Sequence, residues 1–209
     1  MRVGFALGNI GPIGTTDNLI KIAERGEALA YDSLWAVERL LWPVKPQSPY
    51  PVTPDGSLPE EYKHVLDPLE ALTFVAARTK KVALGTSVID MPYYNPVMLA
   101  RRISTLDVLS GGRVRLGLGL GWSKDEHEAI GAEMKHRGAR ADEFLQVLKA
   151  IWTTDPAVFQ GRFHTLRSPT FIPSRCRSST RRSTWAHSCR RRSSALPSMA
   201  MDGTPSRSQ

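Results

Sequence analysis

Val82-Ala-Leu-Gly-Thr-Ser-Val-Ile89 begins as an apolar run of the length typical of a buried strand. Towards its end it places Gly85, Thr86 and Ser87 where a core strand usually has bulky residues. Small and hydroxyl-bearing residues at the end of an apolar strand are expected where another molecule lies against the backbone. The stretch therefore predicts a strand whose carboxyl end meets a ligand.

Strands alternate with helices on both sides of this stretch. Short runs at residues 3–7, 33–37 and 114–120 are typical of buried strands, as is 82–89 itself. A helical pattern follows each of them, and the last one places Phe144, Val147, Leu148, Ile151 and Trp152 on one face. Four strand–helix units in this order require a parallel sheet with right-handed crossovers. They amount to half of an eightfold α/β barrel.

Capping residues mark where the helices begin. Asp17 is the expected N-cap of the first helix, Asp67 of the second and Asn95 of the third, and the last two are each followed by proline. A Gly-Gly pair closes the third helix. The proline-rich segment 43–59 is longer than a usual connection, which indicates a lid or an insertion rather than scaffold.

The net charge of +8 comes almost entirely from the end of the chain. Residues 174–209 hold eight of the 28 basic residues, one of the 20 acidic residues and both cysteines. Residues 1–173 are left with 20 basic and 19 acidic residues and with no disulfide framework or thiolate metal cluster. No run approaches the ~18 apolar residues of a membrane span. These features favour a cytoplasmic protein without a membrane or nucleic-acid partner.

Candidate site residues follow the strands, because ligands of parallel α/β sheets gather at the strands' carboxyl ends. Glu38 is predicted to hold a cofactor or move a proton, and the alternative is a surface ion pair with Arg39. Gly119 and Gly121 would let backbone amides approach a phosphate closely. Alternating glycine also serves tight barrel packing, so the two explanations stand side by side.

A helix is expected to begin near residues 123–126, just after these glycines. His127 has no partners at metal-ligand spacing, so we predict an exposed helix residue rather than a ligand, and no metal site. Asp125, Glu126 and Glu128 are expected to be first-turn acids that suit the helix dipole.

Six stretches of the chain occur together in an order found in one family. They are Tyr31-Asp-Ser-Leu-Trp-Ala-Val-Glu38, Asp67-Pro-Leu-Glu-Ala-Leu, Val82-Ala-Leu-Gly-Thr-Ser-Val-Ile89, Asn95-Pro-Val-Met-Leu-Ala-Arg, Thr105-Leu-Asp-Val-Leu-Ser-Gly-Gly-Arg-Val-Arg-Leu-Gly-Leu-Gly-Leu-Gly-Trp122 and Phe159-Gln-Gly-Arg-Phe163. Through them, residues 1–167 resemble the luciferase-like monooxygenases, a family of flavin and deazaflavin enzymes, and especially its branch that uses coenzyme F420.

The resemblance implies a (β/α)8 TIM barrel, of which about the N-terminal half is encoded, with the flat cofactor ring at the strand carboxyl ends. It implies that Ser87-Val88 is a non-prolyl cis peptide behind the ring, and that Gly85 and Thr86 are small because the ring stacks over them. Glu38 would face the ring as the catalytic residue. The cofactor-binding residues implied in this way are Gly85, Thr86, Ser87, Val88, Gly119, Gly121 and Trp122.

The implied activity is hydride transfer between F420 and a small organic substrate, by a protein that is expected to form homodimers as its relatives often do. The alternative is an FMN-dependent monooxygenase that uses reduced flavin and oxygen. Several deazaflavin relatives have an acid followed by histidine where this chain has Glu38-Arg39, so a histidine acid–base is not implied here. A third, non-enzymatic alternative is a fragment whose basic tail binds nucleic acid or an anionic membrane electrostatically.

The sequence predicts two regions, a partial barrel at 1–173 and a disordered tail at 174–209, which is rich in arginine and serine and lacks periodicity. The family continues at this point with a Gly-Asp-Gly-Trp stretch. Regrouping the codons of Met199-Ala-Met-Asp-Gly-Thr-Pro205 by one nucleotide forces or permits those residues in that order. We hypothesise a one-nucleotide frameshift near Pro173, with a chain that is inactive as truncated.

Overall fold

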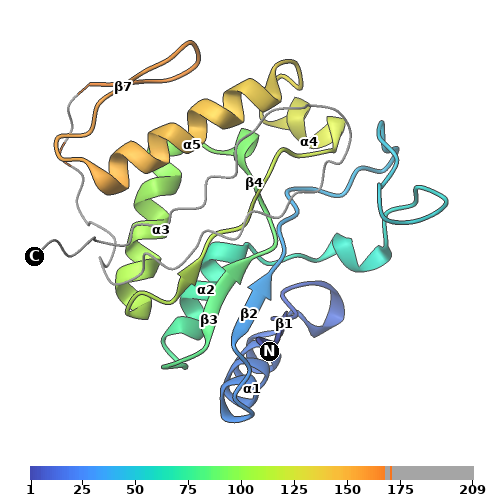
Figure 1. The fold of residues 1–209 in the computed structure, drawn as a ribbon. Helices are drawn as coiled ribbons and strands as arrows, with labels where there is room; N and C mark the ends of the chain where they lie inside the picture. Colours follow the sequence, from blue (N-terminus) through green and yellow to red (C-terminus); the bar gives the residue numbers. More distant parts are fainter. Residues whose placement is uncertain (168–169, 171–209) are drawn as a thin grey trace, which may run out of the picture.

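A parallel sheet forms the centre of the molecule (Figure 1). The structure, a computed structural model, describes residues 1–167 and 170, so the predictions for 174–209 lie outside the described residues. Four strands pair in parallel in the order β1 (Gly4–Ala6), β2 (Ser33–Ala36), β3 (Ala83–Thr86) and β5 (Val114–Arg115). The predicted α/β class with a parallel sheet is confirmed.

Helices connect successive strands of this sheet. The long ones are α1 (Thr16–Ala28), α2 (Pro68–Ala76), α3 (Pro96–Ser110) and α5 (Arg137–Thr153). The shorter elements are the 3-10 turns η1 (Gly11–Ile13), η2 (Glu60–Lys63) and η3 (Met91–Tyr93), the helix α4 (Lys124–Ala129) and the antiparallel hairpin β7 (Phe159–Gln160) with β8 (Thr165–Leu166). Within the described part of the chain, no helix is both long and apolar enough to cross a membrane.

The third and fourth predicted strands are each interrupted. After β3 the chain resumes as β4 (Ile89–Asp90), and after β5 it resumes as β6 (Leu118–Gly119), with β4 and β6 again parallel. Gly85 pairs with Arg115 before the break and Ile89 pairs with Leu118 after it. Three residues of one strand therefore face two of the other, which is the count of a β-bulge.

The side chain of Thr86 closes the gap that this bulge leaves. Its hydroxyl accepts a hydrogen bond from the Gly117 amide at 2.9 Å and donates one to the Gly117 carbonyl at 2.8 Å. The same carbonyl accepts the Ile89 amide, and the Ser87 amide donates to Ala36 on β2. The backbone groups of Gly117 and the amides of Ser87 and Ile89 thus all have partners at the bulge.

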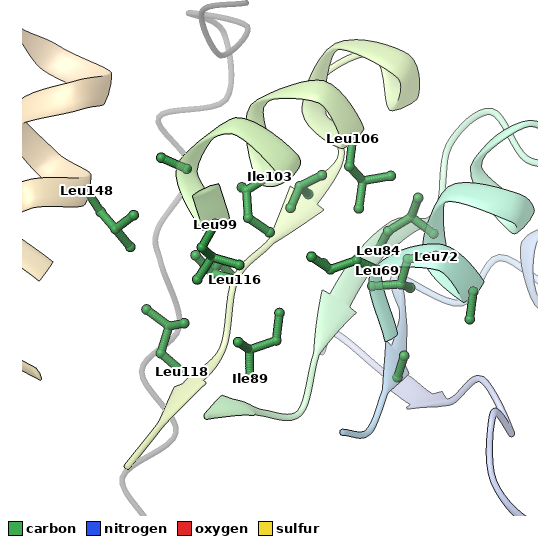
Figure 2. Packing of buried hydrophobic residues seen from close by; sticks show 14 of the residues in the cluster. Leu69, Leu72, Leu84, Ile89, Leu99, Ile103, Leu106, Leu116, Leu118 and Leu148 are labelled. Carbon is green, nitrogen blue, oxygen red and sulfur yellow. The ribbon is translucent and has the colours of Figure 1, made fainter. Parts of the chain in front are cut away.

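The core lies between the sheet and the helices α2, α3 and α5 (Figure 2). Leu84, Ile89, Leu99 and Ile103 are fully buried. Each such side chain stabilises the fold by roughly 1.5–3 kcal/mol relative to its exposed state. The helical stripe predicted for α5 also faces this core, with Phe144, Val147, Leu148 and Ile151 buried and Trp152 packed at the edge.

Two of the three predicted helix caps are confirmed. Asp67 accepts hydrogen bonds from the first-turn amides of α2, and Asn95 does so for α3, which ends at Gly111 with a φ of 69°. The prediction for α1 is wrong, because Thr15 is the N-cap and Asp17 lies inside the first turn. Thr15 has the extended backbone of a cap, and its hydroxyl accepts the Asn18 amide.

The strand predicted at 3–7 is less buried than expected. Gly4 and Ala6 are exposed, and only Leu7, just beyond β1, is fully buried. The reason is that β1 pairs with β2 alone among the described strands and so forms an edge of the sheet.

We predict that Thr86→Val lowers the free energy of unfolding by about 1–3 kcal/mol, because it leaves the buried Gly117 amide without an acceptor. Thr86→Ser keeps the hydroxyl and retains most of the stability. Urea unfolding monitored by circular dichroism measures both. A smaller loss in the valine variant than in the serine variant would show that the hydroxyl is not what joins the strands.

We also predict that Asn95→Ala costs about 1 kcal/mol, because it removes the acceptor for the Val97 amide at the start of α3. Asn95→Asp keeps an acceptor at the same position and serves as the control. In the same unfolding assay, equal losses in the two variants would contradict a capping role.

Candidate functional site

The carboxyl ends of β2, β3 and β6 meet around the Ser87-Val88 peptide. This peptide is cis, as the family resemblance implies. Ser87 is exposed and Val88 is half-buried, whereas Thr86 and Ile89 on either side of them are fully buried. The bulge therefore presents a short piece of strand to the outside at the place where ligands of α/β folds bind.

Gly85 and Thr86 have packing reasons for their small size. A Cβ on Gly85 would lie 2.4 Å from the ring of Trp35, whose indole NH donates to Ser33. Thr86 is buried and spends its hydroxyl on Gly117. A ring stacked on the strand is thus not needed to explain either residue, and the bulge residues Ser87 and Val88 are the accessible part of the predicted platform.

Gly119 and Gly121 pack tightly against the bulge. A Cβ on Gly119 would lie 2.3 Å from a carboxylate oxygen of Asp90 and 2.6 Å from the Val88 side chain. The Gly121 amide donates to the same Asp90 carboxylate at 2.9 Å. The Gly121 amide therefore already has an anionic partner within the chain, and tight packing accounts for Gly119.

Trp122 lies under the proline-rich segment 43–59. Its ring centroid is 5.4 Å from that of Tyr50, which belongs to this segment, and the Arg39 guanidinium lies 4.7 Å from the ring. The segment also contacts α4, because the Gln47 amide donates to Asp125. Trp122 thus packs against segment 43–59 through Tyr50 and against the residues just after β2 through Arg39.

Glu38 lies just after β2 and is held by two neutral donors. The Asp90 amide donates to one carboxylate oxygen at 2.7 Å, and the Tyr94 hydroxyl donates to the other. Burial raises the pKa of Glu38 to about 8, although both hydrogen bonds favour the charged form and pull the pKa down. This carboxyl is therefore protonated in a large share of molecules at neutral pH.

Arg39 does not pair with Glu38. Its guanidinium instead lies 3.2 Å from Glu126, and the two side chains are 5% and 2% exposed. Glu126 also accepts hydrogen bonds from the Leu40 amide and from the Tyr93 hydroxyl. The alternative of a surface ion pair between Glu38 and Arg39 is wrong. Glu126 lies in the first turn of α4, as expected, but it is buried.

His127 is also buried, contrary to the prediction of a solvated helix residue. Its Nδ1 lies 2.9 Å from the Ser123 carbonyl, which can only accept, so Nδ1 donates. Its ring packs against Tyr93 and Gly121. Within residues 1–167, no three histidine, cysteine, aspartate or glutamate side chains are grouped so that they could hold a metal ion.

Asp90 interacts with both Glu38 and Glu126: its amide donates to Glu38, and the charge of Glu126 acts on its carboxyl group. Burial raises its pKa to about 6, the Gly121 amide lowers it, and the nearby Glu126 charge raises it further. The sequence argument missed Asp90, Tyr93 and Tyr94 because it ended the strand at Ile89. Extending the strand-end rule past the bulge would have pointed to this segment, since Asp90 ends β4 and Tyr93 and Tyr94 lie at the end of the η3 turn that follows it.

Comparisons with known proteins identify the family of the chain. The sequence pattern of the luciferase-like monooxygenases matches residues 3–197. An uncharacterized protein of Mycobacterium tuberculosis is 36% identical over 142 residues, which are 68% of this chain and 50% of that protein. The F420-dependent glucose-6-phosphate dehydrogenase of Amycolatopsis mediterranei is 33% identical over 153 residues, which are 71% of this chain and 41% of the enzyme.

Solved structures share the same fold. The monooxygenase RslO1 from Streptomyces bottropensis superposes with a TM-score of 0.67 at 25% identity, over 84% of this chain and 50% of that one. The oxygenating component of 3,6-diketocamphane monooxygenase from Pseudomonas putida gives 0.63 at 19% identity, over 81% and 44%. The chain spans about half the length of the curated relatives it matches. Because the family pattern covers most of it, the chain belongs to the luciferase-like monooxygenase family.

Proposed function

We propose that the strand ends around Ser87 and Val88 form one wall of a deazaflavin site, in an oxidoreductase that transfers hydride between F420 and a small organic substrate. The observation that carries the proposal is the exposed bulge at the carboxyl end of β3, beside a carboxyl group with a raised pKa. The relative from Amycolatopsis mediterranei, an F420-dependent enzyme, supports this choice of cofactor.

The residues present fit a flat ring in two respects. Ser87 is exposed and Val88 half-buried, so that backbone and one apolar side chain are available for stacking. Glu38 is linked to Asp90, three residues after Ser87, through the Asp90 amide. A phosphate cradle is not formed by Gly121, because its amide is bound to Asp90. F420, when bound, supplies a ring carbon that accepts or gives a hydride.

Glu38 would move the proton that accompanies this hydride. If a substrate alcohol were oxidised to a carbonyl here, its hydroxyl proton would pass to the Glu38 carboxylate, and in the reverse direction Glu38 would return that proton to the carbonyl oxygen. A pKa near 8 suits both directions close to neutral pH. Each carboxylate oxygen has a second lone pair, so the bonds from Asp90 and Tyr94 leave room for a substrate hydroxyl.

The second candidate is an FMN-dependent monooxygenase. It is favoured by the likeness in fold to the 3,6-diketocamphane monooxygenase component, whose structure holds FMN. The same exposed bulge would support either ring. Binding of the two cofactors to this chain distinguishes the candidates.

We predict that the chain binds F420, and that Ser87→Tyr weakens binding at least tenfold by placing a side chain where the ring stacks. Thr105→Tyr, on an exposed position of α3, is the matched control and binds as the unmodified chain does. Fluorescence titration with oxidised F420 and, separately, with FMN gives the dissociation constants. Tighter binding of FMN would favour the monooxygenase, and unchanged binding in Ser87→Tyr would remove the bulge from the site.

We predict that the free energy of unfolding of the unmodified chain falls as the pH rises from 5 to 8, when it is compared with that of the Glu38→Gln variant. The pKa of Glu38 is raised from 4.5 to about 8 by folding, so the folded chain binds more protons than the unfolded chain in this window. Stability from this group is therefore present below about pH 4.5 and is lost as the pH rises towards 8. Parallel curves for the two proteins, from urea unfolding at each pH, would contradict the raised pKa.

A further inference from the structure

Two adjacent tyrosines serve two different carboxylates. Tyr93, the last residue of η3, donates to Glu126 at 2.6 Å, and Tyr94, the next residue, donates to Glu38. Neighbouring residues thus point their hydroxyl groups into separate sites, one buried beside Arg39 and one at the end of β2. Only the Tyr94 contact involves the carboxyl group that we assign to proton transfer.

Tyr94 is held from its other side by a charged cluster. The Arg102 guanidinium, on α3, lies 5.9 Å from the centre of the Tyr94 ring. It is bound to Glu70 and lies 3.5 Å from Asp67, the residue that caps α2. The Tyr94 ring thus packs beside a guanidinium that is itself held by two carboxylates at the start of α2.

The groups that face Glu38 come from three elements. Asp90, at the end of β4, contributes its amide and the charge of its carboxyl group, Asp67 contributes a negative charge from the start of α2, and Tyr94 contributes its hydroxyl. Burial raises the pKa of Glu38 most, the two donors lower it, and the charges of Asp90 and Asp67 raise it further. Of the two donors, the amide belongs to a strand and cannot turn away, whereas the phenol is a side chain that can.

We propose that Tyr94 is a positioning residue for Glu38, whose hydroxyl holds one carboxylate oxygen so that the free lone pairs of the carboxylate remain directed at the substrate. The proposal rests on the proton-transfer function assigned to Glu38. Because the phenol donates and does not accept here, it also stabilises the charged carboxylate over the neutral acid. Tyr94 thereby sets the pH range in which Glu38 can take up a proton.

The test is the titration of Glu38 in the chain without any cofactor. Carbon-13 NMR of glutamate-labelled protein gives the pKa of the Glu38 carboxyl, with Glu38→Gln used to assign its signal. Tyr94→Phe removes the donor and keeps the ring beneath Arg102, so the pKa rises by about one unit. An unchanged pKa in a folded Tyr94→Phe variant would overturn the proposal.

Tyr93→Phe is the matched control, because it removes an identical hydroxyl one residue away that serves Glu126. It leaves the Glu38 pKa unchanged if the proposal holds. An equal shift in both variants would mean that general loosening of the segment moves the pKa, and the proposal would fail.

A second variant covers the case in which Tyr94→Phe does not fold. Replacing Tyr94 with 3-fluorotyrosine keeps the size of the ring and makes the hydroxyl a stronger donor, so the pKa of Glu38 falls. A pKa that stays the same or rises contradicts the proposal.

A turnover assay with F420 at a series of pH values distinguishes the positioning role of Tyr94 from the proposed function. If F420 binds and is reduced, the rate rises with pH as Glu38 loses its proton, so Tyr94→Phe shifts the acidic limb of the rate profile to higher pH by the same amount as the NMR pKa. If no cofactor binds while the NMR shift is found, Tyr94 still positions Glu38 and only the assigned reaction is wrong.

Discussion

At the bulge, the hydroxyl of Thr86 accepts a hydrogen bond from the Gly117 amide and donates one to the Gly117 carbonyl, which also accepts the Ile89 amide. One extra residue in the third strand breaks the ladder, and a buried amide left unpaired at that point would cost about 1–3 kcal/mol. A hydroxyl can donate and accept at once, so a single threonine repairs the break. Parallel pairing then resumes at Ile89 in a shifted register, and Asp90, Tyr93 and Tyr94 are brought towards the end of β2.

The same close approach explains the glycines of the fourth strand. A Cβ on Gly117 would lie 2.2 Å from the Thr86 carbonyl oxygen, and one on Gly119 would meet Asp90 and Val88. A larger residue at position 117 would require the backbone to move, and one at position 119 would require the side chains of Asp90 and Val88 to shift. The close approach of the two strands therefore accounts for both glycines, whether or not a ligand also lies nearby.

Local features of the fold could be predicted from the sequence, and long-range ones could not. The caps Asp67 and Asn95 and the order of strands depend on residues close together in the chain. The burial of Glu126 and His127 depends on the segment after β2, whose Leu40 amide reaches Glu126 across 86 positions of sequence. The sequence of α4 by itself has the charge pattern of an exposed helix, and no residue near it in the chain indicates which of its acidic side chains is buried.

The pairing of Arg39 with Glu126 also decides the chemistry of Glu38. Arg39 directly follows Glu38 in sequence, and a salt bridge between them would have lowered the pKa of Glu38. Because the guanidinium is instead bound to Glu126 and packed on Trp122, the partners of Glu38 are a neutral hydroxyl and a neutral amide. Burial then prevails over these two hydrogen bonds, and the pKa rises to about 8. The fold thus gives two adjacent residues different roles. Arg39 is a buried charge paired with Glu126, and Glu38 is a carboxyl group that can exchange a proton near neutral pH.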